Sequence, residues 1–355
     1  MKLGDKKFSR RKLLGSAAGA TAALPLLHEA VPHQGVHDQL AAAQGGQHAG
    51  HETKGVPSEA HKGSAHRGTV GRVDPRVNGF DPHEILRDFD RGKLVREGGR
   101  TVREFELVAE DREIEVAPGV KYAAWTYNSR VPGPTLRVTE GEHVRVKFVN
   151  ASRHPHTIHF HGIHRDLSDG IPAVGAGNID PGGSTVYEFD AFPFGLHLYH
   201  CHSTPLAEHI AKGLYGAFII DPKQGRPEAD ELVMVMNGFD TNFDLGNEIY
   251  AVNTVAFAYH DKPIEVKRGE LVRIYLVNIL EFDLLNSFHL HANFFDHYPT
   301  GTRLEPRDFT DTVILGQGER SILEVRFPFT GKYMFHAHVS EFADLGWMGF
   351  FEVTD

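Results

Sequence analysis

The sequence predicts an all-β protein made of two tandem β-sandwich domains. Around Val144, Val146 and Phe148, apolar residues alternate with charged ones, as in a strand that buries one face. Clusters of glycine and proline, such as residues 131–134 and 181–183, supply turns. Many short strands, frequent turns and few helical patterns are together typical of a sandwich.

An internal repeat indicates that there are two domains. The length suits about two domains, and three segments of the first half have counterparts in the second half. Residues 141–150 match 269–278, residues 156–161 match 286–291, and residues 192–202 match 327–338. Because two copies of one unit explain these matches, we place the domains at residues 101–222 and 231–355.

The first 30 residues predict an export signal. Arg10 and Arg11 follow a lysine-containing stretch and precede the small and apolar run 15–27, which matches a twin-arginine signal peptide over residues 1–30. This run is shorter than the ~20 residues that a membrane span requires, and no other stretch qualifies. We therefore expect no membrane span, and export by the twin-arginine route to the periplasm or the cell exterior.

Two further segments precede the first domain. Residues 31–70 are rich in His, Gly, Ala and Gln and lack apolar periodicity, which predicts a disordered linker. Its histidines suit either a solvated tail or loose capture of metal ions. Residues 71–100 are charged and contain prolines. We expect an N-terminal arm there that packs on the first domain, with a short helix around residues 83–89.

The overall charge argues against two classes of partner. The formal net charge is -10 and the folded body has no long basic run. Nucleic acid and anionic membranes are therefore not expected partners. Histidine is the unusual feature of the composition, because 24 residues of this type exceed what a structural role needs.

The sequence His200-Cys201-His202 contains the only cysteine of the chain. Side chains alternate across a strand, so the two histidines point one way and Cys201 points the other. An exported protein with a single cysteine has no intramolecular disulfide to form. The flanking histidines therefore favour a thiolate that binds a metal ion.

Cys201 predicts a blue copper centre. Such a centre needs one thiolate and two imidazoles in a trigonal arrangement, with a weak axial neighbour. His156 on an earlier strand and His209 on the next loop are the expected imidazoles. Leu214 stands where methionine would make the axial contact, and leucine cannot ligate. We expect a three-coordinate site with a raised reduction potential. The second repeat lacks this site, because Asn286 and Ala337 replace a histidine and the cysteine.

Four His-x-His pairs predict a second metal centre. Each pair presents both rings on one face of a strand. Eight imidazoles suit a cluster of three copper ions. Imidazole binds copper and zinc alike, and the neighbouring thiolate site favours copper. The pairs are His159 and His161, His200 and His202, His289 and His291, and His336 and His338.

Residues 101–355 resemble the multicopper oxidases, and more closely their two-domain members. The motifs that carry this resemblance are residues 132–135, 159–162, 200–202, 289–291 and 336–338. The resemblance implies two cupredoxin-like Greek-key sandwiches, with the type 1 copper in the first domain only. It also implies four copper ions for each functional unit, and a homotrimer in which the three-copper cluster lies between subunits.

The resemblance also implies a role for each site residue. His156, Cys201 and His209 would hold the type 1 copper, and His159 and His289 the type 2 copper. The type 3 pair would be held by the remaining histidines, which are His161, His200, His202, His291, His336 and His338. Asp169 matches an acidic residue that helps proton delivery, although an Asp before Gly also suits a turn. Glu341 is a weaker candidate for the same role.

By this resemblance the protein would oxidise a reductant one electron at a time and reduce dioxygen to water. Phenols, aromatic amines and metal ions remain open as reductants. A copper nitrite reductase has a similar architecture, but its second copper needs only three histidines, so several of the eight would be surplus. A non-catalytic copper-binding or electron-transfer protein is a third reading. A zinc hydrolase would leave the thiolate site without a use.

Overall fold

We describe residues 71–355 from a computed structural model of the chain. The predicted signal peptide (1–30) and linker (31–70) lie outside the described residues. Within the described part of the chain, no helix is both long and apolar enough to cross a membrane.

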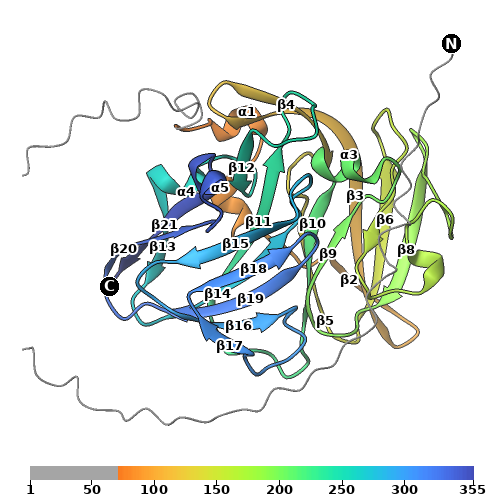
Figure 1. The fold of residues 1–355 in the computed structure, drawn as a ribbon. Helices are drawn as coiled ribbons and strands as arrows, with labels where there is room; N and C mark the ends of the chain where they lie inside the picture. The colour runs from red at the N-terminus through yellow and green to blue at the C-terminus, as the bar shows by residue number, and fades with distance from the viewer. Residues whose placement is uncertain (1–70) are drawn as a thin grey trace, which may run out of the picture. The chain divides into compact units, whose positions relative to one another are not determined.

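The first half of the described chain forms two sheets that face each other (Figure 1). The strands are β1 (Phe89–Asp90), β2 (Lys93–Glu97), β3 (Arg100–Ala117), β4 (Val120–Tyr127), β5 (Thr135–Thr139), β6 (His143–Asn150), β7 (His159–Phe160), β8 (Ser184–Asp190), β9 (Gly195–His200) and β10 (Tyr215–Asp221). One sheet has the order β1-β5-β10-β9-β7, and the other has the order β2-β3-β6-β8, with β4 paired to β3. Leu107 and Phe148 of one sheet share a buried core with Leu136 and Phe218 of the other.

The second half forms another pair of sheets. Its strands are β11 (Asp230–Phe239), β12 (Ile249–Val252), β13 (Lys262–Lys267), β14 (Leu271–Asn278), β15 (Leu285–Leu290), β16 (Phe295–Pro299), β17 (Asp308–Thr310), β18 (Thr312–Gly316), β19 (Arg320–Arg326), β20 (Gly331–His336) and β21 (Met348–Thr354). The sheets have the orders β12-β11-β14-β19-β16-β17 and β13-β21-β20-β15-β18. The expected all-β fold with two sandwiches is therefore confirmed.

The sequence repeat corresponds to a repeat in strand pairing. In the first half, β6 lies between a parallel partner, β3, and an antiparallel partner, β8. In the second half, β14 lies in the same way between β11 and β19. The antiparallel pairs β9–β10 and β20–β21 also correspond. The two sandwiches therefore bring equivalent segments of the sequence to equivalent positions.

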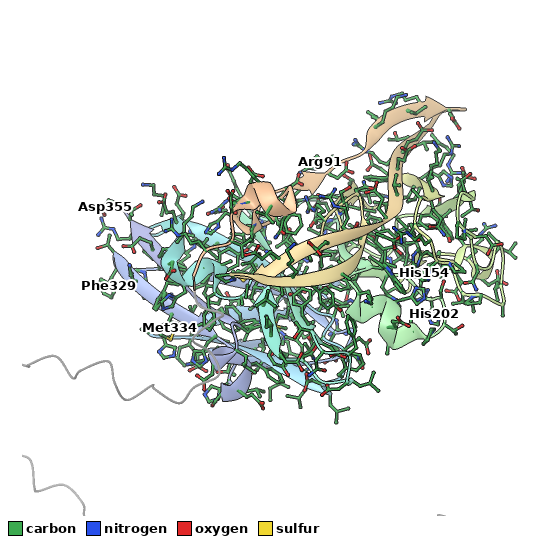
Figure 2. The ribbon with its side chains drawn as sticks, turned by 90° about the horizontal axis from the view of Figure 1, so that it is seen from above. Arg91, His154, His202, Phe329, Met334 and Asp355 are labelled. Carbon is green, nitrogen blue, oxygen red and sulfur yellow. The ribbon has the colours of Figure 1, made fainter. Side chains whose placement is uncertain are left out.

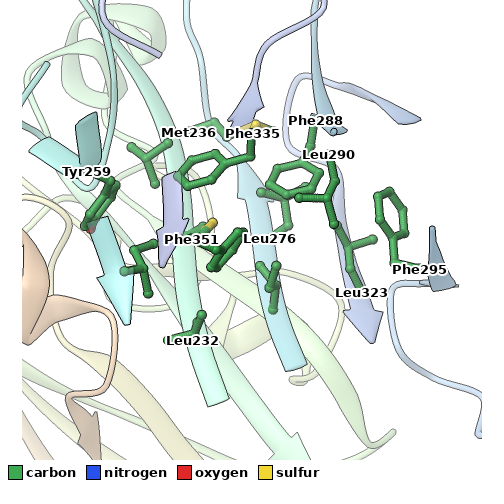
Figure 3. Close-up of a cluster of buried hydrophobic side chains, with 14 of the residues drawn as sticks. Leu232, Met236, Tyr259, Leu276, Phe288, Leu290, Phe295, Leu323, Phe335 and Phe351 are labelled. Carbon is green, nitrogen blue, oxygen red and sulfur yellow. The ribbon is translucent and has the colours of Figure 1, made fainter. Parts of the chain in front are cut away.

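Alternation along β15 links the core of the second sandwich to its histidines. Phe288 and Leu290 are fully buried and point into the apolar cluster shown in Figure 3, where Phe335 stacks on Phe288. His289, between them, is only partly buried, and His291 is exposed. Burial of the large apolar side chains fixes the register of the strand, because a slip of one residue would exchange its two faces.

A second apolar layer joins the two sandwiches. Leu196 and Ile219 of the first sandwich pack in one buried cluster with Val233 and Tyr275 of the second. This layer covers one face of β9, the strand that ends at His200.

A network of ion pairs accompanies this apolar layer, and its Arg137–Glu231 pair joins the two sandwiches. The buried Arg137 guanidinium pairs with Asp221 at 2.8 Å and with Glu231 at 2.6 Å. Arg273 forms a second ion pair with Glu231 at 3.1 Å and another with Glu324 at 2.6 Å. Each charge in this network therefore has a partner of opposite sign, which a buried charge requires.

The N-terminal arm contacts both sandwiches. It contains helices α1 (Pro75–Asn78) and α2 (Pro82–Ile85), of which α2 begins after the N-cap Asp81. The Asn78 side chain donates to the carbonyl of Glu115 in the first sandwich, and Tyr259 of the second donates to the carbonyl of Pro82. The expectation that the arm packs on the first domain is therefore incomplete, and the expected helix ends before β1 begins.

Few helices occur elsewhere in the described chain, and two of them lie beside the histidine motifs. Helix α3 (Leu206–Ala211) follows β9, and α5 (Ser340–Asp344) follows β20. Helix α4 (Ala258–Asp261) precedes β13, and the short 3-10 helix η4 (Asp166–Ser168) lies between β7 and β8. Equivalent helices therefore follow equivalent strands in the two sandwiches.

His197 of β9, which pairs with Phe218 of β10, provides a test of burial in the first sandwich. Its Nε2 lies 2.9 Å from the Pro193 carbonyl, and burial is the main reason that its pKa falls from 6.5 to about 4, with the Arg320 charge adding to the decrease. Below pH 6.5 the unfolded chain binds a proton here that the folded chain does not bind. Stability from this group is therefore complete above that pH and is lost as the pH falls toward 4, by about 2 kcal/mol at pH 5.

The variant His197→Gln keeps a hydrogen-bond donor but cannot titrate. Between pH 7 and pH 5, the free energy of unfolding of the copper-free variant should fall by about 2 kcal/mol less than that of the wild type. Urea unfolding at one fixed protein concentration measures this difference. Identical pH dependence in the two proteins would contradict the burial of this ring.

Candidate metal centres

Three potential metal ligands converge at the end of β9. Nδ1 of His156 lies 3.1 Å from Nδ1 of His209, and the Cys201 sulfur lies 3.8 Å and 3.2 Å from these two nitrogens. A point equidistant from the three atoms is about 2.0 Å from each, which is close to a metal–ligand bond length. All three side chains are buried. The trio therefore fits one ion that takes a sulfur and two nitrogens.

The electrostatics of the trio also suit a cation. Burial lowers the pKa of His156 to about 3 and that of His209 to about 4, so both rings are neutral and can offer a lone pair. Burial raises the pKa of the Cys201 thiol, although the backbone N–H of Thr157, 3.3 Å from the sulfur, opposes this. A bound cation would supply the positive charge that a buried thiolate needs.

Backbone hydrogen bonds place Leu214 beside the trio. The N–H of Cys201 donates to the carbonyl of Leu214 at 3.0 Å, and the N–H of Leu214 donates to the carbonyl of His209 at 3.4 Å. The Leu214 side chain is fully buried in the same apolar cluster as Cys201. It offers no lone pair, so the converging donors among residues 71–355 are the sulfur and the two nitrogens.

The second sandwich has the same backbone pattern with different side chains. The N–H of Ala337 donates to the carbonyl of Trp347 at 3.2 Å, and the N–H of Trp347 donates to that of Phe342 at 2.9 Å. Phe342 and Trp347 therefore stand where His209 and Leu214 stand in the first sandwich. Sequence reasoning missed these two replacements, because the connecting loops differ in length. Apolar rings fill the place of the metal ligands.

Four histidines gather on the other side of β9. Strands β7 and β9 pair so that His159 lies opposite His200. Nε2 of His161 lies 2.9 Å from Nε2 of His200, and the ring of His202 is 5.4 Å from that of His159. We call these four residues the first quartet.

The second sandwich contains an equivalent second quartet. Strands β15 and β20 pair so that His289 lies opposite His336. Nε2 of His291 lies 2.9 Å from Nε2 of His336, and the ring of His338 is 5.3 Å from that of His289. The two quartets thus have the same internal geometry.

Hydrogen bonds orient these rings in the same way in both quartets. Nδ1 of His200 lies 2.8 Å from the Cys201 carbonyl, and Nδ1 of His336 lies 2.7 Å from the Ala337 carbonyl. Because a carbonyl can only accept, Nδ1 carries the proton, and the Nε2 lone pair points into the quartet, where it could bind a metal ion. Carbonyl partners of this kind are typical around metal-binding histidines.

Asp169 contacts the first quartet and Asp311 contacts the second. Nδ1 of His159 lies 2.8 Å from the Asp169 carbonyl and 3.1 Å from its carboxylate. Nδ1 of His289 lies 3.0 Å from the Asp311 carbonyl. Asp169 was expected near the site and Asp311 was missed, because no motif in the sequence marks it. Glu341 is exposed in α5, and in the described residues no ion pair joins it to a histidine.

His164 is a further residue that sequence reasoning missed. Its Nε2 lies 3.4 Å from the Asp169 carboxylate, and its ring is 5.5 Å from that of His159. These three residues form a further group of potential metal ligands. The signal in the sequence was one more histidine, three residues after the His159–His161 pair.

The two quartets are separate within one chain. The groups of converging ligands in the described residues draw on one quartet or the other, never on both. In Figure 2, His202 and Met334, which precedes His336 by two residues, lie on opposite sides of the molecule. One chain therefore provides two half-sites of four imidazoles.

Two sandwiches with a Cys-His₂ trio in the first and a histidine quartet in each define a cupredoxin-like copper protein. A family model described as "Multicopper oxidase" matches residues 109–225, and a second model with the same description matches residues 227–355. The chain belongs to the multicopper oxidase family. The predicted cupredoxin-like fold class is thereby confirmed.

Relatives of this chain include both oxidases and nitrite reductases. A crystal structure of a multicopper oxidase is 59% identical, with a TM-score of 0.79, and the match covers 80% of this chain and 100% of the other. The copper nitrite reductase of Nitrosomonas europaea is 28% identical, with a TM-score of 0.65, over 72% and 94% of the two chains. The copper-containing nitrite reductase of Neisseria meningitidis is 31% identical over 64% of this chain and 63% of its own length. The match thus spans less than two thirds of that curated relative.

Proposed function

We propose that this protein is a laccase-like oxidase that couples one-electron oxidation of a reductant to four-electron reduction of dioxygen to water. The observation that carries the proposal is the position of Cys201 between two sets of converging ligands. Its sulfur meets His156 and His209, while its chain neighbour His200 meets His161. Only a few covalent bonds separate the two sets.

Within this proposal, each set of residues holds particular copper ions. The trio of His156, Cys201 and His209 holds the type 1 copper. His159 and His289 hold the type 2 copper, and the six other histidines of the quartets hold the type 3 pair. When bound, the four ions supply one-electron redox chemistry at the thiolate and dioxygen reduction at the cluster. Asp169 orients His159 and is the proposed group for proton delivery.

The cluster is proposed to form between copies of the chain. Three ions need eight imidazoles here, and each chain offers four on each of two separate sides. A quartet of one copy would meet the other quartet of the next copy. Such head-to-tail contacts close into a ring when the rotation between copies allows it. We propose a homotrimer with three such clusters.

Reduction of nitrite is the second candidate. The relationship to nitrite reductases at 28–31% identity favours it. It would need fewer histidines than the two quartets contain, so we rank it below the oxidase. A role in copper binding or electron transfer without catalysis would leave the shared geometry of the quartets without a purpose. Export by the twin-arginine route remains part of the proposal and is independent of the site.

Cys201→Ser tests the proposed function directly. Serine removes the thiolate, so the intense visible absorption and the oxygen uptake with a reducing dye should both be lost from the copper-loaded protein. Wild-type protein should consume oxygen and release no nitric oxide from nitrite. Retained colour in the variant, or release of nitric oxide without oxygen uptake in the wild type, would overturn the proposal.

Leu214→Met tests the placement of the type 1 ligands. A thioether beside the ion would stabilise its oxidised form, so the reduction potential should fall. A spectroscopic redox titration of the blue absorption measures the change. The matched control is Leu290→Met in the core of the second sandwich, which should leave the potential unchanged. An equal or higher potential in Leu214→Met would mean that Leu214 does not face the ion.

Mixing two inactive variants tests the shared cluster. His200→Ala damages the first quartet only, and His336→Ala damages the second only. In an equal mixture, half of the copies have an intact first quartet and the other half an intact second quartet. About a quarter of the interfaces in mixed trimers therefore join two intact quartets, so oxygen uptake should return to about a quarter of the wild-type value. The variants should be unfolded and refolded together, with each refolded alone as the control. No recovery, or a monomer with four copper ions in native mass spectrometry, would contradict the trimer.

A further inference from the structure

Trp125 of β4 covers the two histidines of the trio. Its ring centroid lies 5.2 Å from that of His156 and 4.8 Å from that of His209. These two histidines are 0% and 4% exposed, respectively. A reductant in solution can therefore make little direct contact with either ring. Trp125 is itself 9% exposed, and its ring contacts both histidines of the trio as well as the exposed His154.

A cavity of 480 Å³ opens over Trp125. Its volume lies in the range of about 300–1,000 Å³ that is typical of small-molecule sites. The exposed ring of His154, which Figure 2 labels, lies 4.6 Å from the indole and forms one wall. The residues around the opening include Ala123, Trp125, Arg153, His154, Glu208 and Lys212. A flat molecule could thus enter beside two aromatic rings.

The charges of the cavity favour an organic molecule over a metal ion. Asp111 pairs with Arg153 at 3.6 Å, and Glu113 pairs with Lys121 at 2.6 Å. In the described residues, none of the groups of converging metal ligands includes a carboxylate of this cavity. The Lys212 ammonium lies 5.7 Å from the Trp125 ring centroid, so a cation is already beside the indole. Asp111, Glu113 and Glu208 balance Arg112, Arg153 and Lys212 around the cavity, so its lining has no net charge to attract a metal cation. The indole, by contrast, offers an aromatic ring a face to stack on.

We propose that a phenol or an aromatic amine docks in this cavity, and that its electrons reach the trio through Trp125. This inference rests on the proposed oxidase function and names its substrate class. One electron leaves the aromatic donor, crosses the indole and is taken up at the metal held by His156, Cys201 and His209. The donor loses its proton to water and departs as a radical. Trp125 ends each step unchanged, and dioxygen is the final oxidant.

Anaerobic stopped-flow reduction of the blue absorption tests the electron path. With hydroquinone, Trp125→Leu should be reduced about tenfold more slowly than the wild type, because a positioned aromatic contact is lost. Trp125→Phe should recover part of the rate. Reduction by hexaammineruthenium(II), which needs no stacking, should change by less than about twofold. Equal rates with hydroquinone, or equal slowing with both reductants, would overturn the proposal.

A second variant tests docking without altering Trp125, and so controls for a general effect of the first variant on folding. Ala123 is exposed on β4 at the opening of the cavity, and Ala123→Gln should obstruct it without touching the trio. The hydroquinone concentration at half-maximal rate should rise, while the visible absorption spectrum stays that of the wild type. An unchanged concentration dependence would place docking elsewhere.

Docking can also be measured without copper. The chain has only two tryptophans, Trp125 and Trp347, and Trp347 is fully buried in the second sandwich. Copper-free protein labelled with 5-fluorotryptophan should show two fluorine signals, which Trp347→Phe assigns. Hydroquinone should shift the Trp125 signal in a saturable way and leave the other in place. Two unmoved signals would reject the cavity, whereas a colourless or inactive wild type would reject only the proposed function.

Discussion

Alternation of side chains across the end of β9 is the constraint on which the rest of the molecule depends. Cys201 belongs to the buried trio with His156 and His209, and His200, on the opposite face of the strand, belongs to the first quartet. A shift of one residue would exchange these faces and destroy both groups. The register is held by the apolar residues of β9, which are buried between the two sandwiches. Packing of the core therefore determines which potential metal ligands converge on each side of β9.

The two sandwiches share one pattern of backbone hydrogen bonds and differ in the side chains placed on it. Equivalent hydrogen bonds surround Cys201 and Ala337, and equivalent histidines follow on the opposite face. Phe342 and Trp347 place apolar rings where the first sandwich has His209 and Leu214, so the second sandwich has an apolar core at this point. The quartet occurs in both copies, on the face of the strands opposite to Cys201 and Ala337.

Much of the fold followed from the sequence, because alternation, turns and a repeat are local signals. The grouping of the site histidines was also predictable, since strand pairing aligns residues that the repeat had already matched. Phe342 and Trp347 were missed because loop lengths differ between the repeats, and Asp311 was missed because no motif marks it. The arm was assigned to the first domain alone, because the sequence does not reveal the carbonyl of Pro82 as an acceptor for Tyr259.

The sequence by itself determined the strands, their faces and the residues able to bind copper, because these depend on side-chain chemistry and a period of two. Only the tertiary structure decided that the quartets lie on opposite sides of one chain. It alone also decided that Trp125 covers the trio beneath an open cavity. Such features arise from packing between segments distant in sequence, which no local pattern records.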